Sequence, residues 1–268
     1  MNRIFKNLVV FVVMILPLTA FSEGDPWDHH FVKMSDGANL HYVTMGKGTP
    51  IILLHGAGGS GEGNWMRNGI GPALAKTNLV IALDQRGHAY TDAGDRSKMT
   101  QDVLELMNHL GIEKAHIGGY SMGGATTSGL LKIAPERFIT ASVMGIGIKE
   151  TEEWLGKTPQ DPAMARRQVA NEGNNTPRID LTARADGAPR GAPKGAPEPN
   201  PEVDLTKIHF PVLALNGGND RPLAKTHRMW RELRDFTYVV IPGRNHMEAC
   251  RDPLFGDALV RFITANNP

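Results

Sequence analysis

Residues 118–124, Gly-Gly-Tyr-Ser-Met-Gly-Gly, restrict the possible folds of this chain more than any other segment. An apolar run precedes them, and a run of helix-forming residues at 125–133 follows. A Gly-x-Ser-x-Gly pattern between a strand and a helix predicts a tight turn that projects Ser121 above the strand ends. Glycine suits positions 119 and 123, because side chains at Gly119 and Gly123 would collide across a turn whose serine is strained.

A Gly-x-Ser-x-Gly pattern also occurs by chance, and the alternative interpretation is a glycine-rich turn that holds an ordinary surface serine. In the functional interpretation, the helix after Ser121 directs its first amides toward the serine and favours negative charge there. An activated serine also needs a base, an orienting acid and an oxyanion hole. The rest of the chain must therefore supply these partners.

Length and composition exclude several classes of protein. The 268 residues fit one sizeable domain with room for an insertion, and 41% hydrophobic residues are enough for a core. The formal net charge of +1, without a dominant basic block, gives nucleic-acid binding no support. Because Cys250 is the single cysteine, an intrachain disulfide is impossible.

The first 22 residues have the layout of a secretory signal peptide. Two basic residues precede a continuous apolar run at 8–16, and small residues follow, so cleavage is expected after Ser22 or else after Ala20. The alternative is an uncleaved N-terminal membrane anchor, but the apolar run is shorter than the ~18–20 residues that span a bilayer. We expect a periplasmic or secreted protein without stable membrane insertion after removal of residues 1–22.

Apolar runs and helical spacing alternate along most of the chain. A hairpin of two edge strands is predicted at 31–34 and 40–44. Further strands are predicted at 51–54, 79–83, 114–119, 138–145, 211–216 and 236–241, and helices at 65–76, 99–110, 125–133 and 253–266. This alternation predicts an α/β fold with a doubly wound, mostly parallel sheet of about eight strands. Ligands of such sheets bind at the carboxyl ends of the strands.

One segment, 146–207, interrupts the alternation. It is polar and rich in proline, and residues 187–198 repeat the pattern Gly-Ala-Pro-x. Recurring proline and glycine exclude a regular helix or a central strand, so the repeat is expected to be extended and flexible. We therefore predict an α/β core formed by 23–145 and 208–268, interrupted by a small cap at 146–207. A simple surface linker is the alternative.

Two further side chains complete a catalytic pattern with Ser121. Asp220 and His246 each come shortly after one of the last two predicted strands. The carboxyl ends of parallel strands meet at one edge of a sheet, so these side chains are expected near the serine. Their order in the chain, Ser then Asp then His, is the order used on this architecture. Each element alone is a weak signal, but the three together are specific.

With these motifs the chain resembles the α/β-hydrolase superfamily over nearly all of its mature length. The matching segments are 55–58, 84–88 and 119–123, together with Asp220 and His246. The resemblance implies a catalytic triad of Ser121, Asp220 and His246. It also implies an oxyanion hole formed by the backbone N–H groups of Ala57 and Met122. The segment 84–88 resembles a structural turn of the family and receives no catalytic role.

The resemblance implies chemistry without a metal or an organic cofactor. Serine at the turn disfavours the dehalogenases and epoxide hydrolases of the superfamily, which use aspartate, and the cysteine-dependent dienelactone branch. We expect a secreted serine hydrolase, a carboxylesterase that acts on a small-molecule ester. Alternatives are a carbon–carbon bond hydrolase, a cofactor-free haloperoxidase-like enzyme, and a noncatalytic binding protein on the same fold.

Several other residues have competing interpretations. Glu150 is a rival to Asp220, because relatives can place the acid after the preceding strand, although a surface carboxylate is the preferred interpretation. Trp65, Tyr120 and Trp154 are candidates to line the substrate pocket, but such residues are as often part of a core. His55 is expected to brace its loop rather than take part in chemistry. The pair at 29–30 lacks ligand spacing for a metal site.

Overall fold

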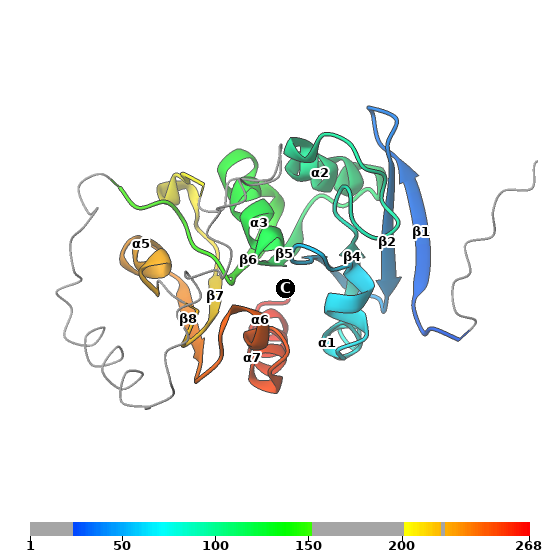
Figure 1. Cartoon of the computed structure of the whole chain (residues 1–268). Coiled ribbons are helices and arrows are strands. Elements are labelled where there is room, and N and C mark those ends of the chain that lie inside the picture. Colours follow the sequence, from blue (N-terminus) through cyan, green and yellow to red (C-terminus); the bar gives the residue numbers. More distant parts are fainter. Residues whose placement is uncertain (1–23, 152–200, 221–222) are drawn as a thin grey trace, which may run out of the picture.

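The computed structural model describes residues 24–151, 201–220 and 223–268 (Figure 1). In these residues the strands form one eight-stranded sheet with the order β1-β2-β4-β3-β5-β6-β7-β8. The strands are β1 (Asp28–Lys33), β2 (Asn39–Met45), β3 (Thr49–Leu54), β4 (Asn78–Leu83), β5 (Ala115–Tyr120), β6 (Phe138–Met144), β7 (Val212–Gly217) and β8 (Phe236–Ile241). Strands β3 to β8 pair in parallel, and β1 and β2 are antiparallel. The predicted doubly wound, mostly parallel sheet is confirmed.

Helices cover both faces of this sheet (Figure 1). They are α1 (Ile70–Leu74), α2 (Met99–His109), α3 (Met122–Ile133), α5 (His227–Glu232), α6 (His246–Ala249) and α7 (Pro253–Ala265). Buried side chains of α2, α3 and α5 belong to one apolar cluster, and those of α1, α6 and α7 belong to another. Along β3, Ile52 and Leu54 enter the first cluster while Ile51 and Leu53 enter the second. Because β3 is buried on both faces, its sequence is a continuous apolar run.

The prediction of one continuous helix at 65–76 is wrong, because the structure has two separate helical segments there. A wide helical turn, η1 (Glu62–Met66), comes first, and α1 is a separate short helix. Gly69 separates them with a left-handed backbone (φ 84°), and the side chain of Asn68 accepts a hydrogen bond from the amide of Ile70. A residue in the left-handed conformation interrupts helical geometry, so η1 and α1 cannot form one continuous helix, which the apolar spacing alone did not reveal.

The predicted hairpin is present, but only one of its strands is an edge strand. β1 and β2 pair in antiparallel fashion, and β2 also pairs with β4, so that Tyr42 lies opposite Leu83. The second neighbour of β2 is β4, which lies far along the chain. The hairpin pattern therefore identified the strands but not the place of β2 inside the sheet.

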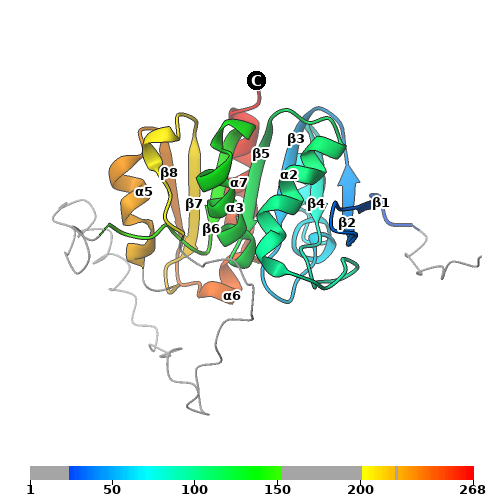
Figure 2. The same cartoon turned by 90° about the horizontal axis from the view of Figure 1, so that it is seen from above.

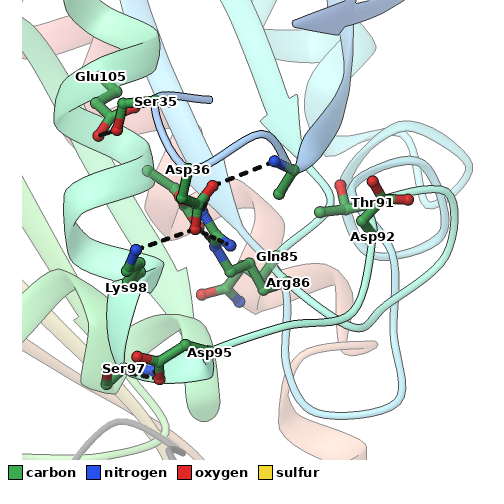
Figure 3. Close-up of polar contacts among 12 residues, drawn as sticks. Ser35, Asp36, Gln85, Arg86, Thr91, Asp92, Asp95, Ser97, Lys98 and Glu105 are labelled. Carbon is green, nitrogen blue, oxygen red and sulfur yellow. Dashed lines mark hydrogen bonds and ion pairs between the residues drawn. The ribbon is translucent and has the colours of Figure 1, made fainter. Parts of the chain in front are cut away.

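Charged side chains fasten the tip of this hairpin to the body of the protein (Figure 3). Asp36 accepts from Arg86 at 2.8 Å and from Lys98 at 3.1 Å. Arg86 also forms a buried bidentate pair with Asp102 of α2, with N–O distances of 2.6 and 2.7 Å. Arg86 thus links the β1–β2 turn to α2, which agrees with a structural role for the segment 84–88.

The two described ends of the predicted cap segment lie side by side. The amide of Lys149 donates to the carbonyl of Pro201 at 3.2 Å. Arg228 of α5 donates to the carbonyls of Lys149 and Val203, each at 2.9 Å. Ile148 and Val203 are both buried in the cluster that faces α5. One arginine therefore joins both ends of the segment to α5.

The predicted signal peptide, the residue Trp154 and the Gly-Ala-Pro repeat lie outside the described residues, and their assignments stay predictions. Within the described ranges, no helix is long and apolar enough to cross a membrane.

Candidate active site

Ser121 occupies a strained turn between β5 and α3. Its backbone has φ 55° and ψ −112°, which is unusual for a residue with a side chain. A Cβ atom on Gly119 would lie 2.1 Å from the carbonyl oxygen of Gly123, and one on Gly123 would lie 2.2 Å from that of Leu54. Only glycine fits this close approach, as the sequence pattern predicted. The turn places Ser121 at the first turn of α3, at the carboxyl end of the central strand.

His246 connects Ser121 with Asp220 through its two ring nitrogens. His246 begins α6, which lies at the end of the sheet where the parallel strands finish (Figure 2). Its Nε2 lies 2.9 Å from Ser121 Oγ, and its Nδ1 lies 2.8 Å from Asp220 Oδ2. A carboxylate can only accept, so Nδ1 carries the proton and donates to Asp220. In the neutral ring, Nε2 is then free to accept the proton of the Ser121 hydroxyl.

Asp220 is buried and holds a negative charge. Burial would raise the pKa of its carboxyl group, but hydrogen bonds from His246 and Lys225 outweigh burial, and the pKa is lowered. Lys225 Nζ lies 2.9 Å from Asp220 Oδ1. The two carboxylate oxygens therefore have different partners, the imidazole on one side and an ammonium group on the other.

Tyr120 contacts His246 through both its hydroxyl group and its ring. Its hydroxyl donates to the carbonyl oxygen of His246, and the two ring centroids are 5.2 Å apart. A Cβ on Gly145 would lie 2.9 Å from the Tyr120 ring and 3.1 Å from His246 Cε1, so the glycine leaves room for both rings. Burial raises the pKa of the Tyr120 hydroxyl, which therefore stays a neutral donor.

The loop after β3 runs beside Ser121. A Cβ on Gly56 would lie 3.6 Å from Ser121 Cβ, which places the neighbouring Ala57 next to the serine turn. His55 braces this loop as expected, because its Nε2 accepts from the Gln85 amide at 2.9 Å and its Nδ1 donates to the Gly56 carbonyl at 2.7 Å. Met122, the other expected oxyanion residue, is the first residue of α3.

The remaining candidate residues lie elsewhere or have other partners. The Glu150 carboxylate accepts two hydrogen bonds from Arg231, at 2.8 and 3.2 Å. Trp65 is buried in the core cluster that also contains Tyr120. His29 Nδ1 lies 3.0 Å from His41 Nε2, and His30 Nε2 lies 2.8 Å from Thr44 Oγ1. The structure thus brings Ser121, His246 and Asp220 together and gives Glu150 a different partner.

Comparison with known proteins identifies the fold family of this chain. A family model described as alpha/beta hydrolase fold matches residues 49–190, more than half of the 268-residue chain. The chain belongs to the α/β-hydrolase fold family. In this α/β-hydrolase, the match includes the segments around Ala57 and Ser121, whereas Asp220 and His246 lie beyond it.

Relatives of this α/β-hydrolase carry several activities in their names. It is 31% identical over 236 residues to a dihydrolipoyllysine-residue acetyltransferase component of the acetoin cleaving system from Pseudomonas putida, a match that covers 79% of this chain but only 62% of that protein. It is 29% identical over 260 residues to the 2-hydroxy-6-oxo-6-(2'-aminophenyl)hexa-2,4-dienoic acid hydrolase of Metapseudomonas resinovorans, with 85% and 88% of the two chains covered.

Among solved structures, naproxen esterase (carboxylesterase NP) from Bacillus subtilis matches with a TM-score of 0.64 and 20% identity, covering 88% of this chain and 91% of that chain. At this identity the likeness shows the shared fold alone.

Sequence reasoning missed Lys225 and Gly145. Lys225 stands in a short stretch without apolar periodicity, and Gly145 directly follows a strand, as many loop glycines do. A lysine five positions after a candidate acid was the one available signal, and only the folded chain shows that the two side chains meet.

Proposed function

We propose that this α/β-hydrolase is a serine carboxylesterase with Ser121 as nucleophile, His246 as base and Asp220 as orienting acid. The observation that carries the proposal is the unbroken set of contacts from Ser121 Oγ through the His246 ring to Asp220, with distances of 2.9 and 2.8 Å. A noncatalytic binding protein would not need these three groups in contact on a strained turn.

The proposed reaction uses two acyl transfers. His246 Nε2 takes the hydroxyl proton as Ser121 Oγ attacks the ester carbonyl, and the carbonyl oxygen becomes an oxyanion. Backbone N–H groups of Ala57 and Met122 donate to this oxyanion. His246 then gives the proton to the leaving alcohol oxygen, which leaves an acyl group on Ser121. A water molecule repeats the sequence, releases the acid and restores the serine hydroxyl.

The test is covalent labelling of the serine. Incubation with a p-nitrophenyl alkylphosphonate should add one phosphonyl group per chain, and peptide mapping should place it on Ser121, because only an activated serine reacts quickly. The same sample should hydrolyse a p-nitrophenyl ester. Ser121→Ala is expected to lose both the label and the hydrolysis, while Ser97→Ala, at an exposed serine, should keep both. A label on another serine, or none in folded protein, would refute the proposal.

Carbon–carbon bond hydrolysis is the second candidate, and the similarity to the dienoic acid hydrolase of Metapseudomonas resinovorans favours it. The same three side chains can serve both reactions. A direct comparison of kcat/KM for a p-nitrophenyl ester and for a 2-hydroxy-6-oxo-hexadienoate distinguishes them. A much higher value for the dienoate would replace the carboxylesterase assignment.

We also propose that the protein is exported, with residues 1–22 removed. The support is the basic, apolar and small-residue layout of this segment. N-terminal sequencing of protein expressed with this segment should give a mature chain that begins near Glu23. A retained Met1 in the membrane fraction would favour an anchor.

A further inference from the structure

Lys225 lies closer to the proposed catalytic acid than any motif in the sequence suggests. Its side chain belongs to the short helical segment η6 (Leu223–Thr226), which follows Asp220 in the chain. The ammonium group is 2.9 Å from Asp220 Oδ1 and donates to the carbonyl oxygen of Gly145 at 3.1 Å. The two side chains are 10% and 7% exposed. A lysine this well buried is rare unless it is paired.

The backbone around Lys225 is fixed as firmly as its side chain. The amide of Ile148 donates to the Lys225 carbonyl at 3.2 Å. A Cβ on Gly147 would lie 1.6 Å from that carbonyl oxygen, so the two segments touch without intervening atoms. Lys225 therefore joins the end of β6 to the loop after β7, and it does so at the acid.

We propose that Lys225 is a positioning residue of this site: it holds the Asp220 carboxylate in place and weakens the affinity of His246 for a proton. The inference rests on the proposed function. Asp220 orients the imidazole and stabilises the positive charge that the ring gains when it takes the serine proton. A second cation on the same carboxylate offsets part of that negative charge. It therefore keeps His246 an unprotonated base at lower pH than Asp220 alone would.

Other titratable groups near this pair do not compete with Lys225. Tyr120 from β5 contacts His246, and Cys250 follows α6. Burial raises the pKa of the Tyr120 hydroxyl and of the Cys250 thiol, so both stay neutral at assay pH. Glu248 is engaged in capping α6 through the amide of Asn245. Within the described residues, Lys225 is therefore the cation paired with Asp220.

The competing explanation is purely structural. Lys225 donates to Gly145, so it could serve only to hold η6 against β6. That role would affect folding and stability but would leave the proton affinity of His246 unchanged. A charge effect through Asp220 makes a different prediction, because it must disappear when Asp220 loses its charge.

The experiment compares Lys225→Met with Lys225→Arg, using Lys207→Met as the matched control. Lys207 forms a Lys–Asp pair with Asp204, but on the surface, with its side chain 69% exposed. Steady-state ester hydrolysis across pH is measured for each variant, and thermal melting checks folding. Lys225→Met should lower kcat about tenfold with little change in KM. The midpoint of the acid limb of kcat/KM should rise by about 0.5 to 1 pH unit.

Lys225→Arg keeps the charge and should leave that midpoint near the wild-type value, as should Lys207→Met. A second readout does not depend on activity: NMR titration of the His246 ring should show the same upward shift in Lys225→Met. The shift should vanish in the Asp220→Asn background, because the two residues act through one carboxylate.

Two results would overturn the inference: an unchanged midpoint in folded Lys225→Met, or a shift that persists without the Asp220 charge. Failure of the proposed function gives a different result, since wild-type protein would then show neither hydrolysis nor labelling at Ser121. The NMR titration would still decide the role of Lys225.

Discussion

In the part of the chain that the structure describes, this α/β-hydrolase has two histidine–aspartate pairs with nearly the same geometry. In one, His246 Nδ1 lies 2.8 Å from Asp220, and in the other, His41 Nδ1 lies 2.7 Å from Asp84. Both aspartates come after parallel strands, at the same edge of the sheet. The pair alone therefore does not distinguish a catalytic site from a structural contact.

The two pairs differ in what the second ring nitrogen of the histidine, Nε2, contacts. His246 Nε2 faces Ser121 Oγ, and the His246 side chain is 32% exposed. His41 Nε2 faces His29 instead, and the side chains of His41 and Asp84 are only 1% and 2% exposed. A substrate could approach the first pair but not the second.

The aspartates differ in their remaining partners as well. Asp84 accepts from the amide of Gly61 at 2.7 Å and from that of Tyr90 at 3.3 Å, so it joins two loops to β2. Asp220 instead accepts from the Lys225 ammonium group. The same residue types thus serve as a loop anchor at one position and as a candidate base and acid at the other.

The largest expected difference between the pairs is in turnover. Asp220→Asn should lose on the order of 10⁴ in kcat, because the imidazole loses its orientation and the stabilisation of its positive charge. Asp84→Asn should keep kcat within about tenfold but unfold more easily, by roughly 1 to 3 kcal/mol, because buried donors lose a charged acceptor. Ester kinetics and urea unfolding of both variants measure this contrast. Equal losses of kcat in two folded variants would remove the distinction between the pairs.

A third histidine, His55, makes the stability of the fold depend on pH, and this effect can be measured separately from catalysis. Burial lowers the pKa of His55 to about 4, whereas the unfolded value is 6.5. The unfolded chain therefore binds the extra proton between these values. The contribution of neutral His55 to stability is complete above pH 6.5 and is lost as the pH falls toward 4.

Urea unfolding at pH 7.5 and pH 4.5 tests this sign, with His55→Gln as the variant that cannot titrate. Wild-type protein should lose roughly 2 to 3 kcal/mol more than the variant over this interval. A parallel loss in both proteins would show that His55 is not held neutral by the fold.

The smallest expected effect is at Glu150, the rival acid. Its carboxylate is paired with Arg231, so Glu150→Gln should lower kcat less than about tenfold and change stability by less than about 1 kcal/mol. The control is Asp220→Asn in the same assay. A severe loss in Glu150→Gln together with near-normal activity in Asp220→Asn would reverse the assignment of the acid.

Local sequence determined the elements that depend on neighbouring residues. Glycine at 119 is required by an atom of the same turn, the carbonyl oxygen of Gly123, so the Gly-x-Ser-x-Gly pattern predicted the turn well. Continuous apolar runs predicted the buried strands because both faces of the sheet are covered. Asp220 and His246 could be named because parallel strand ends converge by topology, whatever the details of packing.

Tertiary structure decided the features that join distant segments. The sequence did not show that β2 lies inside the sheet, that Gly69 separates η1 from α1, or that Arg228 contacts both ends of the segment 149–203. It also did not show which aspartate–histidine pair would face a serine, or that Lys225 reaches Asp220. A long side chain can reach many partners. The strand order arises from pairing across the whole chain, and it determines which partner lies within reach.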